Sequence, residues 1–138
     1  LYSGEKMSFA LDVSKFVEKA KKNPEKVMRQ VSIKLFSAII KASPVDTGRF
    51  RMNWMASGGI PAPGITDATD KSGNIAIGNA TSFVLKAADW HEFTLTNNLP
   101  YAQRLEYGHW SKQAPQGMVR INVSRFQQLI NEEANKVK

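Results

Sequence analysis

The tripeptide Asp46-Thr47-Gly48 is the stretch whose residue types could carry catalysis, because Asp-Thr-Gly is the active-site signature of aspartic proteases. Those enzymes use two aspartates that share one proton. The chain contains one copy of the tripeptide, so a protease would have to be a homodimer. Arg49 and Arg51 follow directly, and cations this close hold a carboxylate ionised, whereas a shared-proton pair needs one member that is easily protonated. A homodimeric protease is therefore the third of three hypotheses for this chain.

The same residues also have a structural interpretation. Pro44 ends the helix before it, because the residue preceding a proline is pushed out of the helical region. The Asp46 carboxylate is then expected to cap the next short helix, with Thr47 beside it, by accepting free backbone N–H groups of the first turn. Gly48 would let another backbone approach closely. On this interpretation the tripeptide is a helix cap.

Aromatic rings and cations alternate just after the tripeptide. Phe50 and Trp54 are four positions apart, so both can anchor a short helical turn to the core. Arg49 and Arg51 would project from that rigid base, as in proteins that grip nucleic acid with interleaved basic and aromatic residues. A solvated basic surface above buried aromatics explains the pattern equally well.

No other residues combine into a catalytic or metal site. His91 and His109 stand alone, with few carboxylates nearby. The chain has no cysteine, which excludes disulfides, thiol catalysis and zinc–thiolate sites. The segment GNIAIGNA at 73–80 does not match the glycine patterns of phosphate-binding loops. The sequence therefore supports no enzyme and indicates no cofactor.

The composition limits the classes of protein to which the chain can belong. A chain of 138 residues with 42% hydrophobic and 22% charged residues is typical of one globular domain. It has no apolar run near the roughly 20 residues that span a membrane. The net charge of +7 suits an acidic partner, of which nucleic acid is the commonest, or serves solubility alone. Residues 1–6 are expected to be a leader or tag remnant, which leaves 7–138 as the domain.

Hydrophobic periodicity predicts two N-terminal helices. Apolar residues recur at helical spacing from Phe9 onward, which favours a first helix at roughly 9–22. Asn23 and Pro24 are typical of an N-cap and a first helical position, and they begin a second helix that ends at Pro44.

The middle of the chain has a different character. The stretch 58–73, rich in Gly, Pro, Asp and Thr, predicts a long loop. Short β-prone segments at 53–57, 74–78 and 92–96 predict strands. Residues 81–90 fit a helix or a strand.

Two further helices are expected near the C-terminus. Pro100 can open a short helix that ends near Gly108. The start of the last segment, at 119–123, fits either period, and helix is favoured from Ser124 onward.

Two segments resemble one family. SPVDTGRFRMNW, at 43–54, resembles the Ser-Pro-Val-Asp-Thr-Gly-x-Leu/Phe-Arg-x-x-Trp stretch of a neck and tail-completion protein family of tailed bacteriophages, the group that includes minor tail protein Z of phage lambda. LTNNLPYAQRLEYGHWSKQAPQGMVR, at 95–120, is similar to the second block of that family. The likeness covers nearly all of residues 7–138, although 58–90 matches nothing in detail.

The resemblance implies a non-enzymatic virion protein. It implies a ring at the head–tail junction, assembled in the bacterial cytoplasm, that completes the tail or joins it to the head around the DNA channel. The head connector and the tail tube or terminator proteins would be its partners. The implied fold is a single small α+β domain with two N-terminal helices and a C-terminal helix packed on a short antiparallel sheet, in agreement with the order of elements above.

The resemblance also directs attention to particular residues. A ring subunit needs two different complementary surfaces, and the loop 58–73 is a candidate arm that orders on contact. Arg49 and Arg51 would lie near a subunit contact or the lumen, where positive charge weakly attracts DNA phosphates. The candidate cap and interface residues are Asp46, Thr47, Gly48, Arg49 and Arg51, and the candidate structural anchors are Phe50, Trp54, Pro100, Tyr101, Leu105 and Tyr107. The alternative function is that of a basic single-domain nucleic-acid-binding protein.

Overall fold

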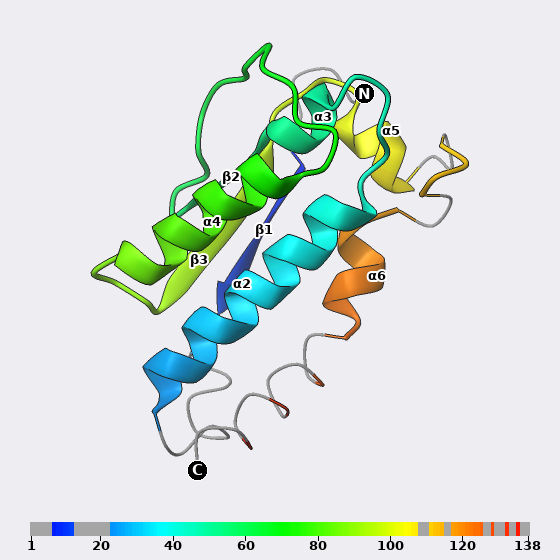
Figure 1. Cartoon of the computed structure of the whole chain (residues 1–138). Helices are drawn as coiled ribbons and strands as arrows, with labels where there is room; N and C mark the ends of the chain where they lie inside the picture. The colour runs from blue at the N-terminus through cyan, green and yellow to red at the C-terminus, as the bar shows by residue number, and fades with distance from the viewer. Residues whose placement is uncertain are drawn as a thin grey trace.

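Three antiparallel strands form one sheet in the order β1–β3–β2 (Figure 1). They are β1 (Met7–Asp12), β2 (Trp54–Ser57) and β3 (Glu92–Asn97). Two of them, β2 and β3, fall where β-prone segments at 53–57 and 92–96 predict strands. The structure is a computed structural model, and it describes residues 7–12, 23–107, 111–114, 117–125, 128, 132 and 135.

The strand β1 corrects the prediction of a helix at roughly 9–22. Residues 7–12 pair with β3 in continuous register, from Met7 opposite Asn97 to Asp12 opposite Glu92. The sequence at 9–13 fits an alternation of period two as well as a helical period, and pairing with β3 decides between them. Residues 13–22 lie outside the described residues, as do residues 1–6.

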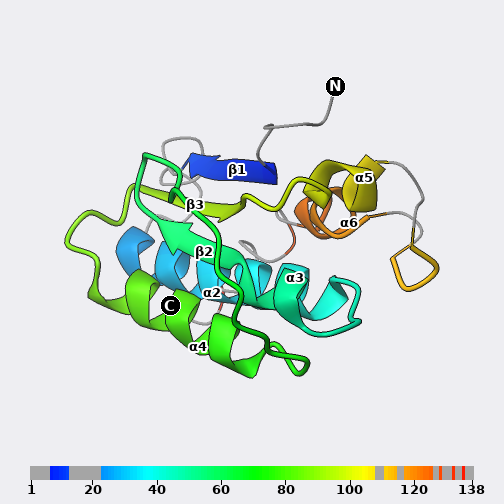
Figure 2. The same cartoon turned by 90° about the horizontal axis from the view of Figure 1, so that it is seen from above.

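Two long helices pack together and cover one face of the sheet (Figure 2). They are α2 (Pro24–Ala42) and α4 (Asn74–Lys86). The predicted ends of α2 are confirmed: Pro24 is in the first turn, and Ser43, just before Pro44, is extended with ψ 141°. Asn23 stands at the N-cap position as predicted, but its side chain makes no capping hydrogen bond, because its backbone is left-handed with φ 47°.

The helix α4 corrects the prediction of a strand at 74–78 and resolves the ambiguity after it. Two isoleucines gave this segment a β-prone composition, but Ala76, Ala80 and Val84 lie four apart and are all buried. This one-sided burial is the pattern of a helix packed on a core.

The described part of the chain also contains the short helices α3 (Arg49–Met52), α5 (Ala102–Tyr107) and α6 (Val119–Val123). The position of α5 confirms the helix expected after Pro100. The helix α6 settles the ambiguous segment at 119–123. Beyond Ser124 most positions of the predicted C-terminal helix lie outside the described residues.

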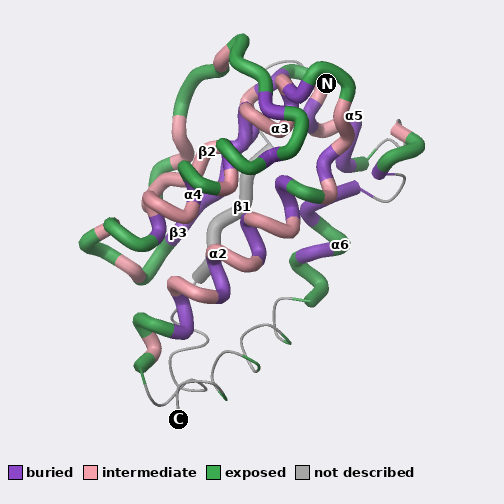
Figure 3. Tube along the Cα trace, in the orientation of Figure 1, coloured by how far each residue is buried: buried purple, intermediate pink, exposed green. Residues whose placement is uncertain are grey.

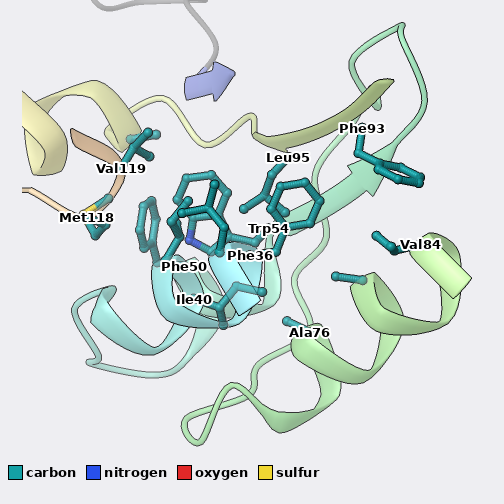
Figure 4. Packing of buried hydrophobic residues seen from close by; sticks show 14 of the residues in the cluster. Phe36, Ile40, Phe50, Trp54, Ala76, Val84, Phe93, Leu95, Met118 and Val119 are labelled. Atoms are coloured by element: carbon teal, nitrogen blue, oxygen red, sulfur yellow. The ribbon is translucent and has the colours of Figure 1, made fainter. Parts of the chain in front are cut away.

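The core lies between the sheet and the two long helices. Phe93 and Leu95 point from β3 toward them, and Phe36 and Trp54 fill the centre (Figure 4). Burial follows one stripe along α2, while its other side alternates between intermediate and exposed (Figure 3). The fold class is α+β, as expected. Among the described residues, no helix combines the length and the apolar character needed to cross a membrane.

Candidate functional site

The two sequence blocks meet at one surface pocket of about 290 Å³. Residues 44–50 form one wall, and Tyr101, Leu105, Ser111 and Gln113 form the other. The Gln113 side chain joins the two walls, because its Oε1 accepts from the Val45 N–H at 2.8 Å and its Nε2 donates to the Val45 carbonyl at 2.9 Å. Segments that are about fifty residues apart in the chain therefore form a single feature.

Buried aromatic rings form the base of this feature. The Phe50 ring lies 5.8 Å from the Tyr101 ring and 5.8 Å from the Trp54 ring, measured between centroids. The Trp54 indole donates to Ser43 Oγ at 2.8 Å, which ties β2 to the end of α2. Phe50 and Trp54 are buried, as predicted, with 5% and 2% exposed, but Trp54 lies in β2 and not on one helical turn with Phe50.

Asp46 does not cap α3, which corrects the central structural prediction. The N-cap position of α3 belongs to Gly48, and no side chain makes a capping bond there. Gly48 takes the N-cap position with φ 93°, and Asp46, two residues earlier, makes no capping bond to α3. Thr47 takes a small part of the expected role, because its Oγ1 accepts from the Arg49 N–H at 3.2 Å.

Asp46 is instead an exposed residue that lines the pocket with Tyr101. Burial raises the pKa of the Tyr101 phenol, Arg49 opposes that rise, and the Asp46 carboxylate adds to it. Tyr101 therefore keeps its proton at neutral pH.

Gly48 confirms the prediction of a close backbone approach. A Cβ at this position would lie 2.5 Å from the Lys71 nitrogen and 2.6 Å from the Asp70 carbonyl carbon, and φ is +93°. The Gly48 carbonyl accepts from the Asp70 N–H at 3.0 Å. Only glycine allows both the left-handed backbone and this contact.

Asp70 makes capping bonds of the kind predicted for Asp46, but at the start of α4 and not of α3. It is 7% exposed, and its Oδ2 accepts from the backbone N–H groups of Ile75 at 2.7 Å and Ala76 at 3.1 Å. Its Oδ1 accepts from Ser72 Oγ at 3.0 Å. Burial raises the pKa of Asp70, but the bonds from Ala76, Ser72 and Ile75 outweigh it, so the pKa lies below the ordinary value.

Asp70 could have been found from the sequence. Asp70 and Ser72 are residue types that favour the start of a helix, and they stand shortly before Asn74. The assignment of 74–78 to a strand removed the helix that this signal would have introduced.

Arg51 holds three segments together inside the chain. Its Nε donates to the Ser43 carbonyl at 3.0 Å, its Nη2 to the Lys41 carbonyl at 2.9 Å and its Nη1 to the Lys71 carbonyl at 2.8 Å. Arg49 donates to the Thr66 carbonyl and pairs with Asp67 at 3.1 Å. Neither arginine is simply solvated, and their place at a subunit contact stays a prediction.

The loop 58–73 has no helix or strand, as predicted, but it is fixed to the domain along its length. Asn53 Oδ1 accepts from the Thr66 N–H at 2.9 Å, and Asn53 Nδ2 donates to the Thr66 carbonyl at 3.0 Å. The Asn98 amide donates to the carbonyls of Ala62 and Gly64. These bonds do not support an arm that orders only on contact.

Two isoleucines of this fixed loop nevertheless face outward. Ile60 is 84% exposed and Ile65 is 53% exposed. The loop therefore presents apolar side chains from a backbone that is held in place.

Glu106 organises the second block. It is fully buried, and its carboxylate accepts from the N–H groups of Met118 at 2.6 Å, Val119 at 2.8 Å and Arg120 at 2.7 Å. Arg120 Nε also donates to it at 3.0 Å. Gly117, with φ +86°, provides the space that the Glu106 carboxylate occupies, because a Cβ there would lie 2.7 Å from the carboxyl carbon of Glu106.

The remaining candidate anchors divide by exposure. Leu105 is 7% exposed and belongs to the core. Pro100 is exposed, and Tyr107 is 48% exposed, with its ring centroid 4.6 Å from the Arg120 guanidinium carbon. Tyr107 thus anchors α5 through a cation–π contact and not through core burial.

The described histidine, His91, is exposed and its Nδ1 lies 2.9 Å from Asp89 Oδ1. Hydrogen bonds from the His91 backbone and ring lower the pKa of Asp89. Within the described part of the chain, no three His, Asp or Glu side chains gather as a metal site. His109 lies outside it.

Comparison with known proteins gives no relatives for this chain. No family model matches it, and no curated protein and no solved structure is significantly similar to it.

Proposed function

We propose that this chain is a structural protein of a tailed-phage virion that completes the tail or joins it to the head, as a ring around the DNA channel. The observation that carries this proposal is the meeting of the two resembling blocks at one pocket. Residues 43–54 and 100–113 are joined by the Gln113–Val45 bonds and by the Phe50–Tyr101 contact. Their joint packing gives a structural reason for both blocks to occur in one chain.

The shapes of the described surface are compatible with a ring. A head-to-tail interface closes when its rotation divides the circle, and it needs two different complementary surfaces on each subunit. The pocket beside Asp46 is concave, whereas the fixed loop presents Ile60 and Ile65 outward. These features are candidates for the two sides of such an interface.

Deletion of the gene from the phage or prophage that encodes the chain tests the proposal. Electron microscopy of the lysate should show DNA-filled heads and separate tails, and purified protein added to that lysate should restore joined, infectious particles. An Arg51 variant is unsuitable for this assay, because Arg51 holds three segments of the fold together.

Ile60→Asp supplies the informative variant, since its exposed side chain can change without loss of the fold. Thr69→Asp is the matched control, because it adds the same charge at another exposed position of the loop. Joined, infectious particles formed without any copy of the chain would overturn the proposal.

A further inference from the structure

Three basic residues from distant parts of the sequence have their backbone or side chain close together at one end of the domain. The Arg51 guanidinium lies 2.9 Å from the Lys41 carbonyl and 2.8 Å from the Lys71 carbonyl. The end of α2, the short helix α3 and the start of α4 lie together there in both views (Figures 1 and 2). We call Lys41, Arg51 and Lys71 the basic cluster.

The nearby carboxylates do not neutralise this cluster. Asp70 is turned into the start of α4, where it accepts from Ile75 and Ala76. Asp67 pairs with Arg49, and Asp46 lines the pocket, which no member of the cluster lines.

The two lysines of the cluster are available to a partner. Both are exposed. In the described part of the chain neither ammonium group is paired with a carboxylate, and the Lys41 ammonium lies 3.3 Å from the neutral Asn74 amide oxygen.

We propose that the basic cluster binds phosphate groups of the nucleic-acid backbone without reading base sequence. Lysine ammonium groups are point charges that suit phosphate from many directions, and binding releases counterions from the polyanion. The Arg51 guanidinium already donates to backbone carbonyls. It therefore adds positive potential to the cluster but no directional contact with a phosphate. The start of α4 adds nothing, because Asp70 already occupies its N–H groups. This inference rests on the proposed function, in which DNA passes the subunit.

Fluorescence anisotropy with a labelled duplex DNA of arbitrary sequence tests the proposal across a series of NaCl concentrations. The test variant is Lys41→Gln/Lys71→Gln. Its matched control is Lys26→Gln/Lys86→Gln, which removes the same charge from exposed positions at the other ends of α2 and α4. Circular dichroism establishes that both variants are folded.

We expect the wild-type chain to bind with a Kd of about 10⁻⁴ to 10⁻⁶ M near physiological salt, as for other non-specific binding. The test variant should bind roughly tenfold more weakly at low salt, and the slope of log K against log salt should fall by about 1.8, since each lost phosphate contact removes about 0.9. The control should change the affinity by no more than about twofold and should leave the slope nearly unchanged.

Equal losses in the two variants would overturn the proposal, because binding would then follow net charge and not the cluster. Absence of binding at low salt would also overturn it, as would a cluster-dependent affinity for a polyglutamate peptide but not for DNA. The joining assay reports on the proposed function independently: normal joining without the chain rejects that function, whereas a negative binding assay with a positive joining assay rejects this inference alone.

Discussion

Asp70 and Glu106 are two buried carboxylates that cap two helices by different means. Asp70 acts locally, on amides five and six residues further along its own segment, and its remaining bond comes from Ser72. Glu106 reaches amides 12 to 14 residues away and also receives the Arg120 guanidinium. The first carboxylate shapes the entry to a helix, whereas the second connects α5 to α6.

A glycine with positive φ makes each arrangement possible. Gly48 admits the backbone of Asp70 and Lys71, and Gly117 admits the side chain of Glu106. The comparison shows that a carboxylate binds backbone N–H groups both between the two resembling blocks, at Asp70, and within the second block, at Glu106. The long-range cap at Glu106 has more bonds to lose.

Replacement of Glu106 by alanine should have the largest effect. It leaves three N–H groups at the start of α6 without their acceptor, each worth roughly 1 to 3 kcal/mol when buried and unpaired. We expect a loss of about 4 kcal/mol in the free energy of unfolding, allowing for partial replacement by water. Urea denaturation measures it, with Glu132→Gln as the exposed control.

Gly48→Ala should come next, at about 2 to 4 kcal/mol, because a left-handed non-glycine residue and an overpacked contact each cost about 1 to 3 kcal/mol. The same substitution at Gly78 is the matched control. A Cβ at Gly78 in the middle of α4 meets nothing within 4 Å, so Gly78→Ala should stabilise by about 0.5 to 1 kcal/mol. Equal effects at the two glycines would contradict the close approach at Gly48.

Asp70→Asn should cost about 1 to 2 kcal/mol at pH 7, the range of a lost helix cap. Because the pKa of Asp70 is lowered by folding, its contribution is present above the unfolded-state pKa of about 3.9 and is lost as the pH falls through the lower folded value. The difference in unfolding free energy between wild type and variant should therefore shrink below about pH 4. Asp67→Asn, at an exposed position, should show little of this pH dependence.

The sequence predicted those parts of the fold in which one period dominates. The stripe of α2, the stop before Pro44 and the alternation of β3 belong to this group. The prediction of secondary structure failed at 74–78, where a β-prone composition disagrees with the helical spacing of the buried residues. It also failed at 9–12, where a short segment fits both the strand period and the helical period. In both cases a tertiary contact decides: β1 pairs with β3, and α4 packs on α2.

The candidate site was predicted in part for a related reason. Gly48, Phe50 and Trp54 have roles that follow from residue type and spacing. The bonds of Arg51 to carbonyls from two other segments depend on how those segments pack, and no local pattern contains that information. The capping role of Asp70 was missed because the start of α4 was missed.

Asp46→Asn should have the smallest effect on stability. Together with Asp70→Asn, it distinguishes the roles of the two aspartates most directly. Asp46 is exposed and caps no helix, so its replacement should change the free energy of unfolding by no more than about 0.5 kcal/mol. Asp70→Asn removes the same charge from a buried cap whose own backbone contacts Gly48, and it should cost several times more. A loss for Asp46→Asn as large as that for Asp70→Asn would restore a structural role to the Asp46 carboxylate. Pepstatin-sensitive cleavage of a peptide library that disappears in the same variant would instead return Asp46 to catalysis.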